Sequence, residues 1–317
     1  MSLTTIILAA GKSTRMLSLK SKLLFKISGE HIIEHVYRAA KSINSKNIIC
    51  VLGNSPQQLK DFIQKNKIKS VDQKNPCGTA DAVKTAISSM PVNKNNKILI
   101  LCGDVPFISP VTLKKMISKL DNSDLCLGTY MQENPTGYGR IIRNNKKIVG
   151  IIEEKDADGK IKKINEINTG IICVNEGVLR KFIGKIKNNN KQKEYYLTDI
   201  IKLLSDNDYK ISSYTIKNDL ETMGINSKKD LVDLERKLLI KKANDLLNKG
   251  VLIRDVMRTD IKGDLKVQKD VEIDINCIFE DKVTIGSNTT IGHNCYLNRC
   301  KIGKNVHIKP NTIIFGA

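Results

Sequence analysis

The sequence predicts an α/β protein with three consecutive parts: a mostly parallel sheet covered by helices, one helical arm, and a short parallel β-helix. Three patterns predict it. Short β-branched runs alternate with amphipathic helical stretches from residue 3 to about 220, a single helical pattern fills 227–250, and a six-residue repeat follows residue 265. At roughly 100–200 residues per domain, 317 residues suit this division. We place the boundaries at 1–226, 227–252 and 253–317.

The alternation in the first part is typical of parallel sheets. The strand-like runs are short, rich in β-branched residues and bounded by glycine or polar residues, and they cover 4–10, 47–52, 98–102 and 124–129. The stretches with apolar residues at helical spacing cover 31–41, 55–65, 78–90 and 110–120. Strands alternating with helices form a mostly parallel sheet with both faces covered, and such sheets bind ligands beyond the carboxyl ends of their strands.

The helical arm has signals for its start and its end. Ser227 and Asp230 form a capping-box-like pair, and Gly250 is placed to end the helix. An apolar seam lies between them, at Leu231, Leu234, Leu238, Ala243, Leu246 and Leu247. We expect this helix to join two domains.

The last part carries a hexapeptide repeat. Apolar residues recur every six residues, with one five-residue step before the last three, at Ile273, Phe279, Ile285, Ile291, Leu297, Ile302, Ile308 and Ile314. Glycine or an acidic or amide residue often follows. This repeat predicts a parallel β-helix in which each hexapeptide supplies one short face, about three to a coil.

The charge of the chain could indicate a nucleic-acid partner. The formal net charge is +20, from 53 basic and 33 acidic residues, and 44 of the basic residues are lysine. The lysines are scattered along the chain, aromatic residues make up 4% and tryptophan is absent, so no basic–aromatic patch forms. We interpret the lysines as solvated surface and predict no nucleic-acid partner, although their field would attract a phosphate-bearing substrate.

Composition also bears on the compartment. No apolar run reaches the ~18–20 residues that span a bilayer, and no basic segment precedes the apolar stretch 2–10, which indicates a buried strand instead of a signal peptide. The eight cysteines form no C-x-x-C pair and most lie in apolar runs. We therefore predict no membrane partner and reduced thiols in a cytoplasmic protein. The four histidines lack zinc-site spacing.

Residues suited to phosphate chemistry begin directly after the first strand, in the segment LAAGKSTRM at 8–16. Its small residues let backbone N–H groups approach a polyphosphate, and Lys12 and Arg15 supply counter-charge. An ATPase P-loop is excluded, because Ile6 stands where that motif needs a glycine. By itself the segment also fits an ordinary strand-to-helix turn.

Further positions support a nucleotide site. Lys22 follows a short loop later, and Asp104 ends another buried strand, a common place for a Mg²⁺ ligand, although a lone acid there more often caps a turn. Gln73 offers an amide to the edge of a base, and Gly78 allows close packing.

Together these positions resemble the sugar-nucleotide pyrophosphorylases, and five segments narrow the resemblance. They are NPTGYGRI at 134–141, GIIEEKDA at 150–157, EINTGI at 166–171, EYYLTD at 194–199 and GIN at 224–226. The whole chain, in order, resembles the bacterial bifunctional enzymes that join an N-acetylglucosamine-1-phosphate uridylyltransferase to a glucosamine-1-phosphate acetyltransferase.

The resemblance implies a Rossmann-like nucleotidyltransferase fold followed by a left-handed parallel β-helix. It implies a UDP-N-acetylglucosamine diphosphorylase that joins UTP and N-acetylglucosamine 1-phosphate with Mg²⁺ as cofactor. The products would be pyrophosphate and UDP-N-acetylglucosamine, a precursor of peptidoglycan and lipopolysaccharide and hence a determinant of cell shape. The family's acetyltransferase site lies coils beyond residue 317, so we do not expect acetyl transfer from these residues. A homotrimer through the β-helix is one expected assembly, and a monomer in which the coils fold against the helical arm is the alternative.

The resemblance also implies roles for individual residues. Those expected to contact UTP are Leu8, Ala9, Ala10, Gly11, Gln73, Gly78, Thr79, Cys102, Gly103 and Asp104. Those expected to hold N-acetylglucosamine are Gly139, Glu153 and Asn168. Arg15 and Lys22 would be the catalytic cations that stabilise the phosphates, and Asp104 and Asn226 would ligate Mg²⁺.

Three residues depart from the family pattern. Ser13 replaces a glycine in the phosphate loop, where a Cβ could restrict positive φ, Ser21 replaces a proline, and Cys102 replaces an aromatic residue. None removes a charged or metal-binding group, so we expect activity with altered affinity at most.

Two alternatives stay open at this point. One is a pyrophosphorylase for another sugar phosphate or nucleotide, such as glucose 1-phosphate with dTTP, and the segments GYGR and EINTG argue against it. The other is a non-catalytic regulatory subunit, and the presence of all four charged or metal-binding candidates argues against it. They are Arg15, Lys22, Asp104 and Asn226.

Overall fold

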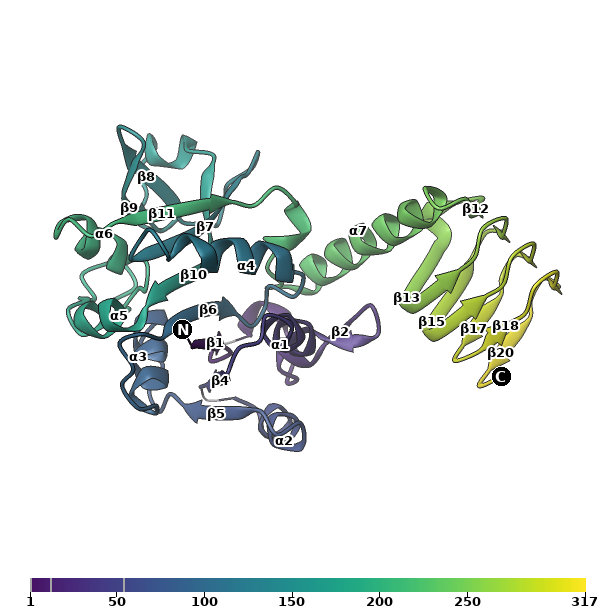
Figure 1. Cartoon of the computed structure of the whole chain (residues 1–317), viewed down its shortest axis with the longest axis horizontal. Helices are drawn as coiled ribbons and strands as arrows, with labels where there is room; N and C mark the ends of the chain where they lie inside the picture. Colours follow the sequence, from purple (N-terminus) through teal and green to yellow (C-terminus); the bar gives the residue numbers. More distant parts are fainter. Residues whose placement is uncertain (1, 12, 54) are drawn as a thin grey trace. The chain divides into compact units, whose positions relative to one another are not determined.

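The computed structural model describes residues 2–11, 13–53 and 55–317 (Figure 1). Contacts between residues divide it into two compact units. The first contains the chain up to Phe25 together with Ile32–Asn226, and the second contains Lys26–His31 together with Ser227–Ala317. A six-residue segment from the N-terminal part of the sequence therefore belongs to the C-terminal unit.

The first unit is built on a nine-stranded sheet whose main order is β11-β7-β10-β6-β1-β4-β5, with β8 and β9 attached beside β10. The strands are β1 (Leu3–Leu8), β4 (Asn47–Leu52), β5 (Lys69–Asp72), β6 (Lys97–Cys102), β7 (Leu125–Met131), β8 (Arg140–Asn144), β9 (Lys147–Ile152), β10 (Glu166–Asn175) and β11 (Ile211–Thr215). β1 runs parallel to β4 and β6, while β10 runs antiparallel to β6 and β7. The predicted mostly parallel sheet is confirmed.

Helices cover both faces of this sheet. They are α1 (Ile32–Ser42), α2 (Gln57–Lys65), α3 (Thr79–Ser88), α4 (Pro110–Lys119), α5 (Glu176–Ile183) and α6 (Asp199–Ser205), with 3-10 turns η1 (Thr14–Met16), η2 (Lys22–Leu24), η3 (Ile161–Lys163) and η4 (Asp219–Glu221). Ile6 and Ile100 pack in one core cluster with α3, α5 and α6, whereas the alternating Ile7 and Leu101 are buried outside it. Successive side chains of a strand face opposite sides, so both sides of the central strands are apolar and covered.

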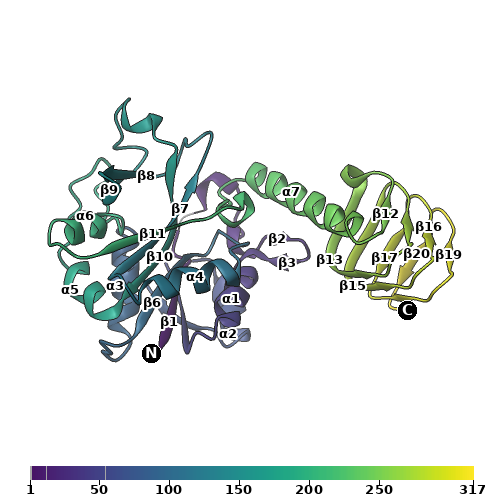
Figure 2. The same ribbon diagram turned by 45° about the horizontal axis from the view of Figure 1, so that its top comes forward.

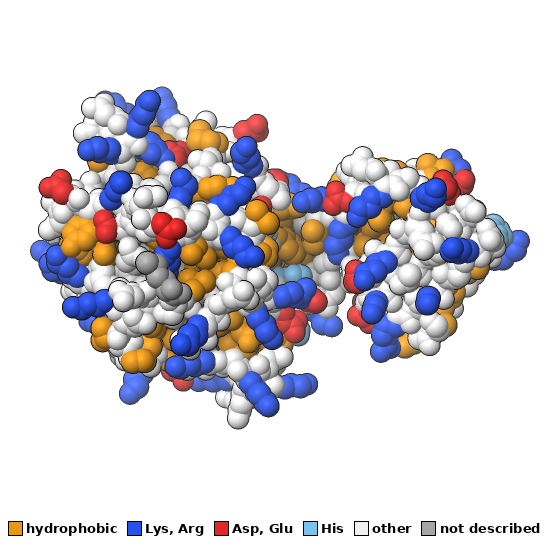
Figure 3. Space-filling model, viewed as in Figure 1, with side chains coloured by type: hydrophobic (Ala, Val, Ile, Leu, Met, Phe, Trp, Pro, Cys, Tyr) orange, Lys and Arg blue, Asp and Glu red, His pale blue; other side chains and the backbone are white. Residues whose placement is uncertain are grey.

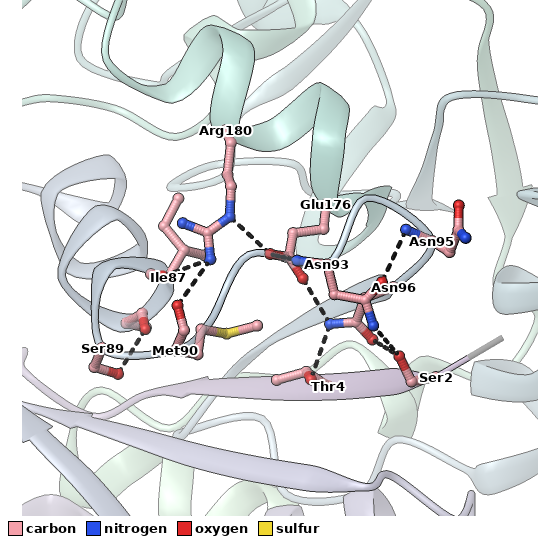
Figure 4. Close-up of polar contacts among 11 residues, drawn as sticks. Ser2, Thr4, Ile87, Ser89, Met90, Asn93, Asn95, Asn96, Glu176 and Arg180 are labelled. Carbon is pink, nitrogen blue, oxygen red and sulfur yellow. Dashed lines mark hydrogen bonds and ion pairs between the residues drawn. The ribbon is translucent and has the colours of Figure 1, made fainter.

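A buried polar network lies near the amino ends of β1 and β6 (Figure 4). Glu176, at the start of α5, is fully buried and accepts hydrogen bonds from Arg180 Nε at 2.7 Å and from Asn96 Nδ2 at 2.8 Å. Asn96 also donates to Thr4 Oγ1 at 3.1 Å, and Arg180 donates to the carbonyl of Ile87 at 2.7 Å. A buried charge is tolerated because it is paired, so this cluster is a structural anchor between α3, α5 and the sheet.

The second unit contains the helical arm and the β-helix. The arm is α7 (Lys228–Leu247), and Ser227 with Asp230 forms the predicted capping box. The regular helix ends at Leu247, its last turn continues through hydrogen bonds from Asn248 and Lys249, and Gly250, with φ +84°, ends that turn at the predicted position. The β-helix strands are β12 (Leu252–Ile253), β13 (Thr259–Val267), β14 (Glu272–Ile273), β15 (Cys277–Ile285), β16 (Thr290–Ile291), β17 (Tyr296–Asn298), β18 (Lys301–Ile302), β19 (His307–Ile308) and β20 (Ile313–Phe315), with η5 (Val256–Arg258).

The strand register shows the predicted parallel β-helix. All pairs in this unit's two main sheets are parallel, with β12-β14-β16-β19 along one side and β13-β15-β17-β20 along another (Figure 2). Ile273 pairs with Ile291 and Ile291 with Ile308, so equivalent positions lie 18 and then 17 residues apart, which is three repeats per coil. Asn276 and Asn294 occupy the turns between faces with φ near +60°, a conformation that asparagine tolerates.

The segment that joins this unit from the N-terminal part is a β-hairpin of β2 (Lys26–Ile27) and β3 (Glu30–His31). Its two turn residues, Ser28 and Gly29, both have positive φ, at 51° and 89°, as a two-residue type I′ turn requires. The sequence analysis did not predict this hairpin.

The structure shows where the basic side chains and the cysteines lie. Basic side chains are dispersed over the visible face of the molecule without forming one continuous patch (Figure 3). Six cysteines are buried, Cys102 is half-buried and Cys77 is exposed. Within the described ranges, we find no helix long and apolar enough to cross a membrane.

Candidate functional site

A cavity of about 590 Å³ opens beyond the carboxyl ends of β1 and β6. Twelve of the residues predicted from separate segments of the sequence line it. They are Leu8, Ala9, Ala10, Gly11, Arg15, Lys22, Gln73, Gly78, Thr79, Cys102, Asp104 and Asn226. The sheet edge at which ligands of parallel sheets bind is thus the edge that gathers these side chains.

The floor of the cavity is the segment after β1. Leu8 O accepts a hydrogen bond from Gly103 N at 2.9 Å, and a Cβ on Gly103 would approach that same oxygen to 2.9 Å. Gly103 therefore lies behind the lining and sets how closely the ends of β1 and β6 approach each other. A Cβ added to Gly11 would meet no atom within 4 Å, so the space beside Gly11 is open for a ligand. Lys12 lies outside the described residues.

Two of the three residues that depart from the family pattern, Ser13 and Ser21, fit the backbone conformation at their positions without strain. Ser13 has φ −82°, so no glycine is required there, and its hydroxyl accepts a hydrogen bond from Lys22 N at 3.3 Å. Ser21 has φ −55°, a value that proline also adopts, and its hydroxyl accepts from Leu23 N at the start of η2. Both serines support the turn that presents Lys22.

Lys22 is the centre of the polar groups in the cavity. Its ammonium forms an ion pair with Asp104 and donates to Asn226 Oδ1 at 3.1 Å. Its side chain is 11% exposed and that of Asp104 is 23% exposed. Three residues that are far apart in the sequence, one of them at the end of the first unit, thus meet at one cation. Arg15 lies on η1 at the rim and is exposed, and no carboxylate partner is assigned to it in the described part of the chain.

Gln73 and the Gly78-Thr79 segment form the opposite wall. The Gln73 side-chain amide donates to Gly78 O at 3.2 Å and to Asp81 Oδ2 at 2.6 Å, so its nitrogen is used within the protein and its carbonyl oxygen is the group offered to a ligand. Gly78 has φ +124°, and a Cβ there would lie 2.4 Å from Tyr195 O. Only glycine fits this position, where the loop packs on the segment that follows α5.

The predicted sugar-binding residues form a second cluster. Asn168 N donates to Gly139 O at 2.8 Å, and a Cβ on Gly139 would lie 3.2 Å from Glu153 Oε2. Thr198 Oγ1 donates to Glu153 Oε1 at 2.9 Å. Burial raises the pKa of Glu153, and the Thr198 hydrogen bond opposes that effect. Gly139, Glu153 and Asn168 therefore lie together, although they are not among the residues lining the 590 Å³ cavity.

Cys102 connects the two clusters. A Cβ on Gly170, two residues after Asn168, would lie 2.7 Å from Cys102 Sγ, and the thiol points to Gly170 O at 3.8 Å. Burial raises the pKa of Cys102 to about 12, with the Asp104 charge adding to the effect, so the group is a neutral thiol. The small side chain keeps β6 in contact with the bulge of β10 after Asn168.

The sequence analysis missed several lining residues. They are Thr14, Leu23, Pro76, Ala82, Gln192 and Glu194. Thr14, Leu23, Pro76 and Ala82 lie within three residues of predicted site positions, so proximity along the chain was an available signal. Gln192 and Glu194 had no such neighbour among the predicted site residues, because their place in the cavity depends on the path of the loop after α5. Among the described residues, no group of three or more His, Cys, Asp or Glu side chains is arranged to hold a metal ion.

The fold and the arrangement of residues around the cavity indicate the class of protein. A parallel sheet with a small-residue loop after its first strand, and with cations gathered around that loop, is built to hold a nucleotide polyphosphate. The sequence profile of the MobA-like NTP transferase domain matches residues 5–164. The chain is therefore a nucleotidyltransferase.

The particular family follows from a curated relative. The chain is 39% identical over 313 residues to the protein named Bifunctional protein GlmU from Acinetobacter baylyi, and the match covers 99% of this chain and 68% of that protein. The chain belongs to the GlmU family, within the sugar-phosphate nucleotidyltransferases.

Solved structures show the same fold at low identity. A UDP-glucose pyrophosphorylase complexed with UDP-glucose superposes with a TM-score of 0.63 at 18% identity, covering 76% of this chain and 100% of that one. The inositol-1-phosphate CTP transferase of T. maritima superposes with a TM-score of 0.56 at 17% identity, covering 74% and 95%. At these identities the likeness concerns the fold alone.

Proposed function

We propose that the chain is a UDP-N-acetylglucosamine diphosphorylase, which joins UTP and N-acetylglucosamine 1-phosphate with release of pyrophosphate. The observation that carries the proposal is the meeting of Lys22, Asp104 and Asn226 beside the loop after β1, in a chain of the GlmU family. These residues lie in three separate segments of the sequence, and all three line one cavity.

The wall at Gln73 supports a uracil-like base. A uracil ring presents an N–H donor at N3 between two carbonyl oxygens, and the Gln73 carbonyl oxygen is an acceptor that suits this donor. Cytosine presents an acceptor at the same ring position and would face that oxygen with repulsion. Since its nitrogen donates to Gly78 and Asp81, the Gln73 amide is held in the orientation that favours uracil or thymine.

The second cluster supports an amino sugar as the other substrate. Glu153 is a half-buried carboxyl that accepts a hydrogen bond from Thr198, and it packs closely against Gly139, where an added Cβ would lie 3.2 Å from its Oε2. A carboxylate next to a glycine and the Asn168 amide is suited to a sugar bearing several hydroxyl and amide groups. Cys102 lies between this cluster and the nucleotide cavity, so the two substrates would meet near it.

Asp104 and Asn226 would hold Mg²⁺. The fit is supported by the structure, since the carboxylate of Asp104 and the amide oxygen of Asn226 already converge on one cationic group, the Lys22 ammonium. Oxygen ligands from one or two side chains, completed by substrate phosphates, are what Mg²⁺ takes in nucleotide sites. When bound, the ion would neutralise negative charge on the phosphates of UTP.

The reaction would be an in-line displacement at the α-phosphorus of UTP by a phosphate oxygen of the sugar phosphate, and the bond to pyrophosphate breaks. The attacking oxygen is already anionic, so no side chain is needed as a general base. The protein would act by positioning the two substrates and by stabilising the added charge on the phosphorus oxygens. Lys22, released from Asp104, and Arg15 at the rim are the cations placed to do so.

A pyrophosphate-release assay with matched substrate pairs tests the proposal. UTP, dTTP and CTP are each combined with N-acetylglucosamine 1-phosphate, glucosamine 1-phosphate and glucose 1-phosphate in the presence of Mg²⁺. The highest kcat/KM is expected for UTP with N-acetylglucosamine 1-phosphate. A higher value for dTTP with glucose 1-phosphate would replace the proposed substrates by the alternative pair.

A further inference from the structure

The β2–β3 hairpin is inserted between residues of the first unit but belongs to the second. It begins directly after η2, the turn that carries Lys22: Phe25 N donates to Lys22 O at 3.2 Å, and Lys26 opens β2. The chain then returns to the first unit at Ile32, whose N donates to Phe25 O at 3.0 Å. The two ends of the insertion are thus tied together three residues from Lys22.

The hairpin is held within the second unit by partly buried polar contacts. Ser28 N, at the hairpin turn, donates to Glu235 Oε1 of α7 at 2.8 Å. Lys242, two helical turns further along α7, donates to Ser28 Oγ at 2.6 Å and to the β13 carbonyls of Ile261 and Gly263 at 3.1 and 3.0 Å. The ammonium has three donors, and these acceptors use all of them. Burial lowers the pKa of Lys242, as expected for an ammonium removed from water.

The fit around the hairpin turn is tight. A Cβ on Gly29, where φ is +89°, would lie 2.5 Å from the carbonyl oxygen of Lys262. Ser28 is buried, and so is Ile27 beside it. A turn enclosed in this way has one docked position within the second unit.

The same helix also begins at the site. Asn226 is the last residue of the first unit, and Ser227, the next residue, is the N-cap of α7. Lys22 Nζ donates a hydrogen bond to Asn226 Oδ1. Lys22 lies just before the hairpin that contacts Glu235 of α7, and Asn226 lies just before α7 itself. Both residues of that contact are linked to one helix, through the hairpin at one end and by direct chain connection at the other.

We propose that Glu235 and Lys242 are positioning residues for uridylyl transfer, which act by docking the β2–β3 hairpin and thereby fixing the turn that presents Lys22. The inference rests on the proposed function, because it takes Lys22 as a cation that acts on the phosphates. Loss of the docking contacts would leave Gln73, Gly78 and the sugar-binding cluster unchanged and would affect the placement of Lys22.

The test is a kinetic double-mutant cycle on the full chain. Lys242→Met and Glu235→Ala are each measured alone and combined with Lys22→Ala, with Lys241→Met, an exposed neighbour on α7, as the matched control. Misplacing a catalytic group by about 1 Å can cost up to about 10²-fold, so we expect a loss of roughly tenfold in kcat from Lys242→Met and a smaller one from Glu235→Ala. KM for both substrates should stay within about twofold, and Glu235→Gln, which keeps the acceptor oxygen, should restore kcat.

The cycle decides between a positioning and a merely structural role. If the contacts act through Lys22, Lys242→Met causes no further loss in the Lys22→Ala background. The same fold-loss in both backgrounds, or unchanged kcat in both docking variants, would overturn the inference while leaving the proposed function intact. Wild-type kcat in Lys22→Ala alone would instead refute the role of Lys22 in the proposed function and would overturn the inference with it.

Discussion

At the residue scale, the cavity joins cations and side-chain oxygen atoms that lie far apart in the sequence. Lys22 contacts Asp104 and Asn226 and is nearly buried, whereas Arg15 is exposed at the rim. An ammonium held by two acceptors is pre-positioned, while an exposed guanidinium can reach a ligand as it binds. The two cations would therefore serve the phosphates in different ways, Lys22 as a fixed charge and Arg15 as a mobile one.

Removing either cation should weaken catalysis. We expect Lys22→Ala and Arg15→Ala each to lower kcat/KM for UTP at least about tenfold, equivalent to about 1.4 kcal/mol of transition-state stabilisation. Steady-state kinetics with both substrates measures this, with the exposed Lys41→Ala on α1 as control. Wild-type kinetics in both variants would mean that the phosphates bind elsewhere.

Glu153 gives the site a pH dependence. Burial raises its pKa from the usual value of 4.5, so the carboxyl takes up a proton at a higher pH than an exposed glutamate does. The ionised form is the better acceptor for sugar hydroxyls, and kcat/KM for the sugar phosphate should therefore fall as the pH drops through this raised pKa. Glu153→Gln should have a low kcat/KM without this acidic limb. An acidic limb that persists in the variant would assign the titration to another group.

Much of the site at this scale could be predicted from the sequence, since small residues, charges and amides follow strands at recognisable points. The backbone conformation of Ser13 could not be predicted. A family pattern suggested a positive φ there, but the observed φ is −82° and the hydroxyl supports Lys22 N. A backbone angle depends on the whole loop, which a one-residue comparison does not describe.

At the element scale, the periodicity of apolar residues in strands and helices predicted most of the fold. The six-residue repeat predicted the coil register, because side chains that stack between coils must be apolar at each inward position. The β2–β3 hairpin was not predicted, because its strands have two residues each, too short for any periodicity. Its place in the second unit depends on contacts with Glu235 and Lys242, more than 200 residues away along the chain.

The buried network around Glu176 should matter for stability and not for kinetics. Removing one partner of a buried pair leaves the other uncompensated, so Glu176→Ala should lower the free energy of unfolding by about 3–5 kcal/mol. The network lies near the amino end of β1, away from the cavity at its carboxyl end, so kcat and KM of the folded fraction should not change. Urea unfolding measures the effect, with the exposed Glu133→Ala as control. A loss of kcat at unchanged stability would contradict the structural role.

At the scale of the whole molecule, the positive charge acts as a dispersed field. The net charge is +20, and the basic side chains are spread over the visible face without one patch (Figure 3). Such a field attracts a polyanionic nucleotide from many directions, and dissolved salt screens it.

Salt should therefore weaken nucleotide capture more than the chemical step. We expect KM for UTP to rise several-fold between about 50 and 300 mM NaCl, with kcat changing by less than about twofold. Initial rates at constant free Mg²⁺ measure this, and a neutral osmolyte at matched osmolality is the control. A KM that does not depend on salt would mean that only local contacts at the cavity attract UTP.

We propose that the cavity around Lys22, Asp104 and Asn226 carries out uridylyl transfer. This is tested by the rate of UDP-N-acetylglucosamine formation by Asp104→Ala at saturating Mg²⁺, compared with the wild type. Loss of a metal-ligating carboxylate next to developing phosphate charge should lower the rate by at least about 10²-fold, and Asn226→Ala should lower it less because an amide carries no charge. A wild-type rate in Asp104→Ala would mean that Asp104 takes no part in the reaction and that the proposed site is wrong.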